Sequence, residues 1–175
     1  MTQHDDQDSS YTRSATAWMT IAVWIIFFLM LFFFFSKLMS KMNNPNDSVA
    51  TRYVDGHKEV VLQRNQYGHY VASGAINGQA VVFLVDTGAT DVAIPEDIAN
   101  KLGLKKGFAF QAQTANGLTM AYSTRLDTVS LGDISLNDIR GSILSNAGTE
   151  EILLGMAFLK HLELNQKGDQ LTLTQ

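Results

Sequence analysis

A single carboxylate, Asp86, ends the apolar run VVFLV at residues 81–85 and is followed by Thr87 and Gly88. A carboxylate among apolar side chains costs free energy unless a charge or hydrogen-bond donors compensate it. A strand that delivers such a group to a turn can place it for general acid–base chemistry. The same carboxylate could instead cap the turn and be satisfied by backbone N–H groups alone. These residues by themselves leave both interpretations open.

Other reactive groups are few. The chain has no Cys, which excludes disulfides, thiol catalysis and Cys-based zinc sites. The net charge is −4, and no cluster of Lys and Arg is large enough to indicate nucleic-acid binding. We therefore expect no cofactor, no metal and no nucleic-acid partner. The four histidines are scattered and form no His-x-x-x-His pair: His4, His57, His69 and His161.

The elements around Asp86 are predicted to be β-strands joined by tight turns. Asn77-Gly78 separates the strand-like runs HYVASGAI and QAVVFLV, and Asn116-Gly117 separates two more. Helices are expected only in PEDIANKLGL, residues 95–104, and at residues 156–162. The pattern predicts a mostly β domain of about 120 residues, a small barrel or sandwich. Further short strands are expected at residues 129–131, 134–136, 139–144, 152–154 and 171–174.

The chain's first part carries 21 residues without a charge, residues 15–35, after an N-terminal tail at residues 1–14. This run is long enough to cross a hydrocarbon core of about 30 Å as a helix. A core helix of a small protein would show a polar stripe, and a signal peptide would have a shorter apolar run with a small-residue cleavage site. Neither is found, so we expect a transmembrane anchor at residues 15–35. The polar residues 36–55 are then a tether, and residues 56–175 form the folded domain.

Three motifs, taken together and in this order, resemble those of the retropepsin-like aspartic proteases. VVFLVDTGAT is similar to their active-site strand and turn, QTANGLTMAY occupies the place of their flap hairpin, and EILLGMAFL looks like their hydrophobic-hydrophobic-Gly element. The resemblance covers roughly 60% of the chain, residues 70–175. Within that family, the combination of DTGAT, TANG and LLGMAFL is similar to a bacterial group of membrane-anchored, single-domain proteases of clan AA. The resemblance implies a small closed β-barrel of the retropepsin type, with one or two short helices.

The resemblance also implies a mechanism for Asp86. In this family two carboxylates share one proton and activate a water molecule. This chain has one D-T-G, so the resemblance implies a homodimer in which Asp86 of each subunit meets at the two-fold axis. Thr87 would then hydrogen-bond across the axis, and the Gly88 N–H would support the carboxylates. Ala89 stands where pepsin-like enzymes carry Ser or Thr, which implies activity nearer mildly acidic or neutral pH.

The same resemblance assigns further positions. Leu153, Leu154 and Gly155 would support the active-site turn. The C-terminal LTLTQ resembles the strand through which family dimers join, although an ordinary edge strand would look the same. The flap tip, or an ordinary surface hairpin, would contain Ala115, Asn116 and Gly117. Four apolar residues could lie in the core or line substrate subsites: Ile94, Leu118, Met120 and Ile152.

The leading hypothesis is a membrane-anchored aspartic endopeptidase that acts on extended polypeptide. One alternative is a catalytically silent protease-like fold that serves as a dimerisation or peptide-binding module. Another is a structural membrane protein in which Asp86 caps a turn. Similarity to the bacterial group favours an inner-membrane protein with a periplasmic catalytic domain. Lys37 and Lys41 favour the opposite orientation, by a small margin over Arg13.

Overall fold

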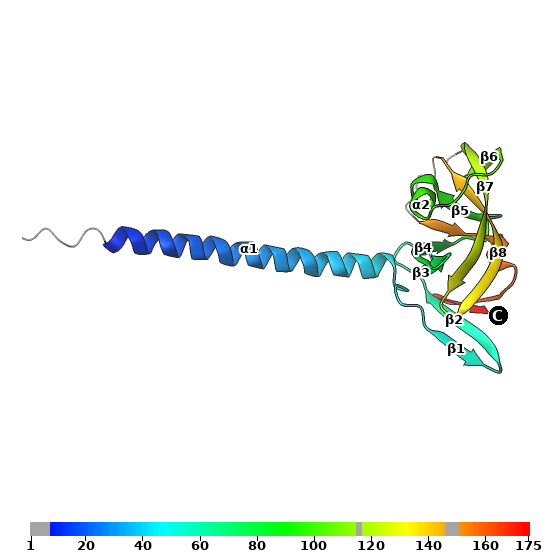
Figure 1. Ribbon diagram of the computed structural model, residues 1–175. Helices are drawn as coiled ribbons and strands as arrows, with labels where there is room; N and C mark the ends of the chain where they lie inside the picture. The colour runs from blue at the N-terminus through cyan, green and yellow to red at the C-terminus, as the bar shows by residue number, and fades with distance from the viewer. Residues whose placement is uncertain (1–7, 115–116, 146–150) are drawn as a thin grey trace, which may run out of the picture. The chain divides into compact units, whose positions relative to one another are not determined.

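The computed structural model describes residues 8–114, 117–145 and 151–175 of the chain (Figure 1). The chain divides into two compact units, Met1–Ser40 and Lys41–Gln175. The helix α1, Asp8–Asn43, includes the apolar run at residues 15–35. Within it, the most apolar 18-residue window of Trp18–Asn43 has a mean hydropathy of 2.5, and these 26 residues would span about 39 Å at 1.5 Å per residue. By length and composition, this helix could cross a membrane.

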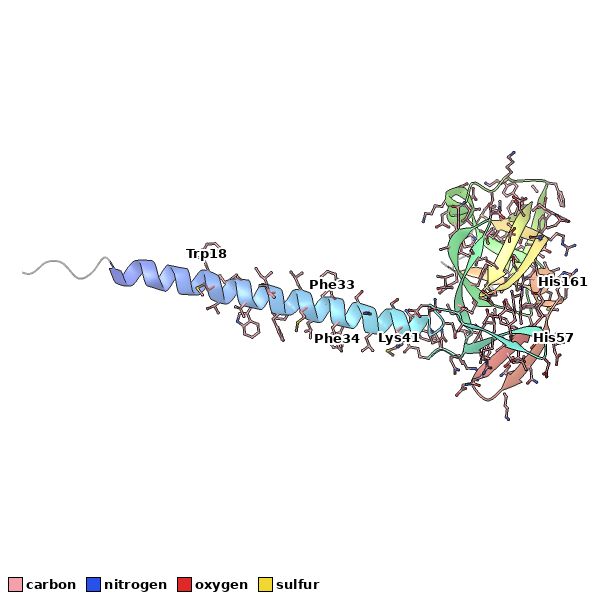
Figure 2. The ribbon with its side chains drawn as sticks, turned by 60° about the horizontal axis from the view of Figure 1, so that its bottom comes forward. Trp18, Phe33, Phe34, Lys41, His57 and His161 are labelled. Atoms are coloured by element: carbon pink, nitrogen blue, oxygen red, sulfur yellow. The ribbon has the colours of Figure 1, made fainter. Side chains whose placement is uncertain are left out.

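Residues 18–35 of α1 carry apolar side chains on all sides of the helix, with Thr20 as the exception. Trp18, Phe33 and Phe34 project from different sides of it and are each more than 60% exposed (Figure 2). A helix that is apolar on all faces needs an apolar environment, which a lipid bilayer supplies.

The second unit is built from two β-sheets. One has the order β1-β2-β11-β10, and the other has the order β3-β4-β9-β5-β8-β7-β6 (Figure 1). An additional pairing of β3 with β7 closes the larger sheet into a ring and leaves β6 outside it. The predicted mostly β fold with a closed sheet is therefore confirmed. The strands are β1 Thr51–Val54, β2 His57–Gln63, β3 Val71–Ile76, β4 Gln79–Val85, β5 Val92–Pro95, β6 Ala109–Thr114, β7 Gly117–Leu131, β8 Ile134–Leu144, β9 Ile152–Leu154, β10 Glu163–Lys167 and β11 Gln170–Thr174.

Tight turns with left-handed residues connect the strands of the ring. Asn77 and Gly78 have φ values of 50° and 78°, as a two-residue type I′ turn requires. The Asn77 side chain accepts a hydrogen bond from the Thr128 backbone N–H at 3.0 Å, which ties this turn to β7. The short strands predicted between residues 129 and 144 are instead parts of the long strands β7 and β8. These two strands pair along most of their length, so neither is interrupted where the sequence pattern weakens.

Both sheets contribute to one apolar core. One cluster of side chains without exposed surface includes Leu62 of β2, Phe83 of β4 and Leu173 of β11, together with Phe158 from the segment between β9 and β10. Gly74 on β3 makes room for the Phe83 ring, because a Cβ atom at this position would lie 2.7 Å from it. The four-stranded sheet and the ring therefore form a single domain.

Two short helices interrupt the strands of the domain. α2, Glu96–Lys101, follows β5 directly, with Pro95 at its N-cap rather than inside the helix. α3 spans only Met156–Leu159, whereas the sequence predicts residues 156–162. The helix ends early because the chain turns at residues 160–162 into β10, which begins at Glu163.

Residues 36–55, predicted to be a polar tether, contain ordered structure. α1 continues to Asn43, and β1 pairs with β2. Between them, Asn46 is 5% exposed and binds the domain backbone. Its Nδ2 donates to the carbonyl oxygens of Gln63 at 2.9 Å and Val71 at 2.7 Å, and its Oδ1 accepts from the Gln63 N–H at 2.7 Å. The sequence shows no apolar period here because amide hydrogen bonds, not apolar packing, dock this segment.

The C-terminal strand β11 lies inside the four-stranded sheet. It pairs with β10 on one side and with β2 on the other. The interpretation of LTLTQ as an ordinary edge strand is therefore wrong, because β1 and β10 are the edges of this sheet.

We predict that Asn46→Ala lowers the free energy of unfolding of the domain by about 2–3 kcal/mol, because it removes three hydrogen bonds and leaves buried backbone groups unsatisfied. Urea unfolding of the chain in detergent measures this loss. The exposed Asn165 on β10 provides a control, since Asn165→Ala should change the value by no more than about 0.5 kcal/mol. Equal losses in the two variants would show that Asn46 does not dock the segment.

Candidate active site

The loop that carries Asp86 crosses the end of a third strand. β9 lies between β4 and β5: it pairs in parallel with β4, through Leu84↔Leu153 among others, and antiparallel with β5 through Ala93↔Leu153. The chain leaving β4 must therefore pass over the end of β9 before it enters β5. Asp86 is the first residue of this crossing loop, so the sheet order determines where its carboxylate lies.

The backbone of the loop holds Asp86 in place. Its N–H donates to the Leu154 carbonyl at 3.2 Å, and its carbonyl accepts from the Ala89 N–H at 3.3 Å. The Gly88 N–H donates to Asp86 Oδ1 at 2.8 Å. The side chain is half-buried, Thr87 and Gly88 are exposed, and no Lys, Arg or His in the described ranges forms an ion pair with Asp86. The carboxylate therefore sits at an accessible surface with one backbone donor on one oxygen.

Gly155, directly after β9, locks this loop against α3. A Cβ atom at residue 155 would lie 2.2 Å from the Asp91 carbonyl oxygen and 2.6 Å from that of Ala89. The next residues donate their N–H groups to the loop, Met156 to the Ala89 carbonyl and Ala157 to the Thr90 carbonyl, each at 2.8 Å. The structure thus brings the Leu-Leu-Gly motif and the Asp-Thr-Gly motif into contact, although 66 positions separate Gly155 from Ala89.

The hairpin of β6 and β7 is the third predicted part. Ala115 and Asn116 lie outside the described residues. Gly117 opens β7 with φ of 100°, and its carbonyl accepts a hydrogen bond from the Thr114 hydroxyl at 2.9 Å. Of the four apolar residues that could line subsites, Ile94 and Ile152 are fully buried in the core, whereas Leu118 and Met120 are exposed on β7.

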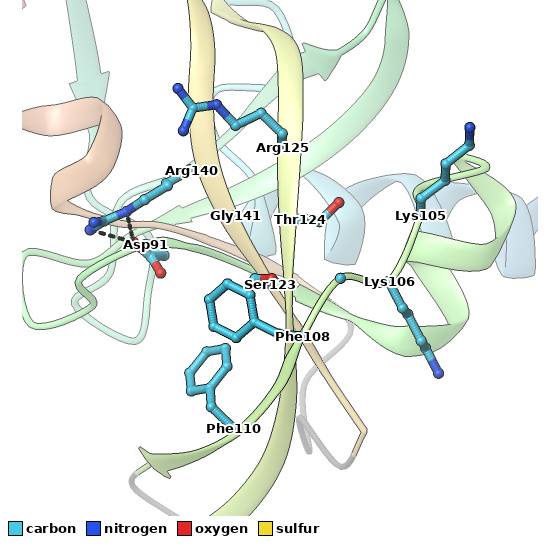
Figure 3. A pocket seen from close by; sticks show the side chains of 11 residues that line it. Asp91, Lys105, Lys106, Phe108, Phe110, Ser123, Thr124, Arg125, Arg140 and Gly141 are labelled. Atoms are coloured by element: carbon cyan, nitrogen blue, oxygen red, sulfur yellow. Dashed lines mark hydrogen bonds and ion pairs between the residues drawn. The ribbon is translucent and has the colours of Figure 1, made fainter.

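A cavity of about 590 Å³ lies beside the loop, and sequence reasoning did not find it. Its wall includes Asp91, Arg140 and the aromatic rings of Phe108 and Phe110 (Figure 3). Arg140 Nε and Nη2 each lie 2.9 Å from Asp91 Oδ1. The two residues are 49 positions apart in sequence and meet because β5 pairs with β8. No local sequence pattern predicts a pair of residues so far apart in the chain, so only the order of the strands in the sheet shows that they meet.

Further ion pairs compensate two of the other cations around this cavity, Arg125 and Lys106. Hydrogen bonding to Arg125 lowers the pKa of Asp138, and hydrogen bonds from Lys106 and Ser145 lower the pKa of Glu96. Lys106 also lies 4.5 Å from the centroid of the Tyr122 ring. Arg125 and Lys106 therefore have ionised partners already at mildly acidic pH.

Comparisons with known proteins point to one family. The profile of the family described as "gag-polyprotein putative aspartyl protease" matches residues 72–161, about half of the chain. The solved structure of a retropepsin-like aspartic protease from Rickettsia conorii matches with a TM-score of 0.58 and 28% identity, over 73% of this chain and 95% of that one.

Two curated sequences are also similar. An uncharacterized protein in the cobV 5′ region of Sinorhizobium sp. is 35% identical over 123 residues, which cover 68% of this chain and 53% of that protein. An uncharacterized protein of Rickettsia prowazekii (strain Madrid E) is 27% identical over 153 residues, 82% of this chain and 64% of that protein. The chain therefore spans between about half and two thirds of the length of these relatives.

We predict that Gly155→Ala destabilises the domain by about 3 kcal/mol, because its methyl group would overlap two backbone carbonyl oxygens that cannot rotate away. Thermal and urea unfolding of the chain in detergent measure the loss. Gly88→Ala is the matched control, since a Cβ atom there would meet only the movable Asp86 carboxylate, at 3.1 Å. A loss of about 1 kcal/mol or less is expected for it. If Gly155→Ala behaved like Gly88→Ala, the contact would not hold the loop.

Proposed function

Because this chain belongs to the retropepsin-like aspartic protease family, we propose that it is an aspartic endopeptidase with Asp86 as its catalytic carboxylate. The observation that carries the proposal is the position of Asp86. A loop tied to both β9 and α3 presents this half-buried carboxylate beside exposed Thr87 and Gly88. A turn-capping carboxylate alone would explain the Gly88 N–H bond but not the rigid support beneath the loop.

The second carboxylate of the dyad is proposed to come from a second copy of the chain. No other Asp in the sequence is followed by Thr-Gly or Ser-Gly. The next Asp along the loop, Asp91, is paired with Arg140. A two-fold dimer places the same residue of both subunits at one axis, so it supplies two Asp86 side chains without a second motif. The dimer would use surfaces other than the two sides of β11, since both are already paired within the subunit.

In this dyad one carboxylate is ionised and the other carries a proton, because two like charges about 3 Å apart cannot both ionise. The ionised carboxylate takes a proton from water while the water oxygen attacks the carbonyl carbon of the amide. The protonated carboxylate gives its proton to the carbonyl oxygen. When the resulting tetrahedral intermediate collapses, a proton passes to the amide nitrogen and the carbon–nitrogen bond breaks. The substrate is an extended polypeptide, which can add strand-like hydrogen bonds to the site.

The Asp86→Asn variant tests the proposal directly. We expect cleavage of a diverse peptide library to fall at least about 100-fold, because a neutral amide cannot act as the base. The rate maximum of the wild-type chain should lie between mildly acidic and neutral pH, since Ala89 offers no hydroxyl to stabilise an ionised dyad. Library cleavage, followed by mass spectrometry across pH, measures both.

Asp97→Asn, on the exposed start of α2, serves as the control and should cleave like the wild type. Undiminished cleavage by Asp86→Asn would refute the assignment of Asp86. A wild-type dimer that binds peptides without cutting them would instead support the alternative function, a peptide-binding or dimerisation module.

The helix α1 is proposed to anchor the enzyme in a bacterial inner membrane through residues 15–35, with the protease domain at residues 56–175 in the periplasm. The exposed apolar side chains of residues 18–35, a stretch without any charged residue, support the anchor. An anchored enzyme would cleave substrates close to the membrane.

We predict that alkaline phosphatase fused to the C-terminus is active in bacterial cells, because this enzyme folds only in the oxidising periplasm. A matched fusion to β-galactosidase, which is active only in the cytoplasm, should be inactive. The reverse pair of results would show that Lys37 and Lys41 decide the orientation and that the domain is cytoplasmic.

A further inference from the structure

One face of the larger sheet links β4, the strand that leads into Asp86, to the cavity beside the active-site loop. Residues directly opposite each other on paired strands lie on the same face of a sheet. One such row crosses the ring from β4 to β7, and its first member precedes Asp86 by two residues. The row is Leu84, Leu153, Ala93, Ser142 and Ser123. Because Ser123 lines the cavity, the row links the catalytic loop to the cavity across one sheet face.

Apolar contacts cover the same path. Leu153 and Phe110 both pack against the buried cluster of Ala93, Ala121 and Leu144. Phe110 also forms part of the cavity wall. A substrate strand that leaves the catalytic loop along this face would therefore meet mostly apolar side chains, with Ser142 as a polar member of the row, before it reaches the cavity.

Strand spacing gives the distance in substrate residues. Counted through β9, the strand β5, which begins just after Asp91, is two positions from β4, and β7 with Ser123 is four positions from β4. At about 4.8 Å per strand these separations, followed along the sheet surface, are about 10 and 19 Å. An extended peptide rises about 3.3 Å per residue, so the cavity lies about three to six residues from the scissile bond.

The chemistry of the cavity favours an apolar occupant over an acidic one. Phe108 is 74% exposed and packs against Phe110 with 6.0 Å between ring centroids. Both rings point toward the Asp91–Arg140 pair, and Lys105 and Lys106 extend away from the rings (Figure 3). Arg140 is paired with Asp91, and Arg125 with Asp138, so neither guanidinium has an uncompensated charge to offer. Aromatic rings beside paired guanidinium groups suit another aromatic ring.

We propose that this cavity is a specificity site of the protease, and that it accepts an aromatic side chain of the substrate three to six residues from the scissile bond. This inference rests on the proposed function, because it takes Asp86 as the centre of cleavage. The volume of the cavity, about 590 Å³, lies within the range of about 300–1,000 Å³ typical of ligand sites.

Peptides that share one cleaved sequence and differ at a single position test the proposal on the full chain in detergent. Each position from three to six residues on either side of the cut carries Phe, Ala or Glu in turn. We expect kcat/KM to be about tenfold higher for Phe than for Ala at one of these positions, and Glu to be no better than Ala. Phe108→Ala should reduce the Phe preference to about twofold or less, whereas Tyr67→Ala, which removes another exposed aromatic ring, should preserve it.

Three outcomes would overturn the proposal: no Phe preference in the tested range, a preference for Glu, or an equal loss on every peptide in Phe108→Ala.

A binding measurement separates failure of this proposal from failure of the proposed function. Fluorescein-labelled peptides of alternating Thr and Val, with Phe, Ala or Glu placed at one position as the guest residue, are mixed with increasing amounts of the Asp86→Asn variant. Fluorescence anisotropy measures their binding. If the Phe peptide binds more tightly than the Ala and Glu peptides, and if adding Phe108→Ala to the Asp86→Asn variant removes this difference, the cavity is supported as an aromatic site even if the wild type cuts nothing. Equal binding of all guests would reject it even if the wild type cleaves peptides.

Discussion

The contact of Gly155 with the carbonyl oxygens of Ala89 and Asp91 is the constraint on which the rest of the candidate site depends. It exists because β9 is inserted between β4 and β5, so that the loop after Asp86 must cross the end of β9. Any side chain at residue 155 would push this loop away from α3, and the Met156 and Ala157 N–H groups would lose their acceptors. A close backbone contact of this kind leaves the backbone of the loop that carries Asp86 little freedom. In the proposed mechanism Asp86 must meet both a water molecule and a second acid, and general acid–base chemistry of this kind requires a rigidly placed loop.

The same inserted strand connects the proposed catalytic carboxylate with the proposed specificity site. β9 is at once the support of the Asp86 loop and the middle of the row that runs from Leu84 to Ser123. On one of its faces Ile152 and Leu154 are buried in the main core, whereas Leu153 packs against the smaller apolar cluster beneath the cavity. A single three-residue strand therefore couples the stability of the core, the position of the carboxylate and the surface over which substrate would lie. This economy suits a small domain, in which few elements are available for each task.

In this domain, polar interactions hold together segments that in other proteins are usually held by apolar packing. Asn46 docks the segment after α1 with three hydrogen bonds to backbone groups of the domain. The Asp91–Arg140 pair links the loop residue directly before β5 to β8 at the cavity edge. The interior position of β11 has a further consequence, since it satisfies within one subunit the hydrogen bonds that a terminal strand could have offered to a partner. The proposed dimer would therefore be held by other surfaces, and the two-fold symmetry of the proposed dyad does not require an exchanged strand.

Much of this protein was predictable from local patterns. The apolar helix, the Asn77-Gly78 turn and the mostly β class follow from residue type and period, because each depends on neighbours within a few positions. The D-T-G and Leu-Leu-Gly motifs pointed to the family and to the residues of the loop. The limits of α3, the docking of Asn46, the interior place of β11 and the length of β7 and β8 were not predictable in this way. What the sequence by itself determined was which groups are available for chemistry: one Asp-Thr-Gly, no Cys and one apolar span. Only the tertiary structure decided that Gly155 supports the Asp86 loop and that Phe108, Phe110, Asp91 and Arg140 share a cavity, because these contacts arise from strand order between residues far apart in the chain.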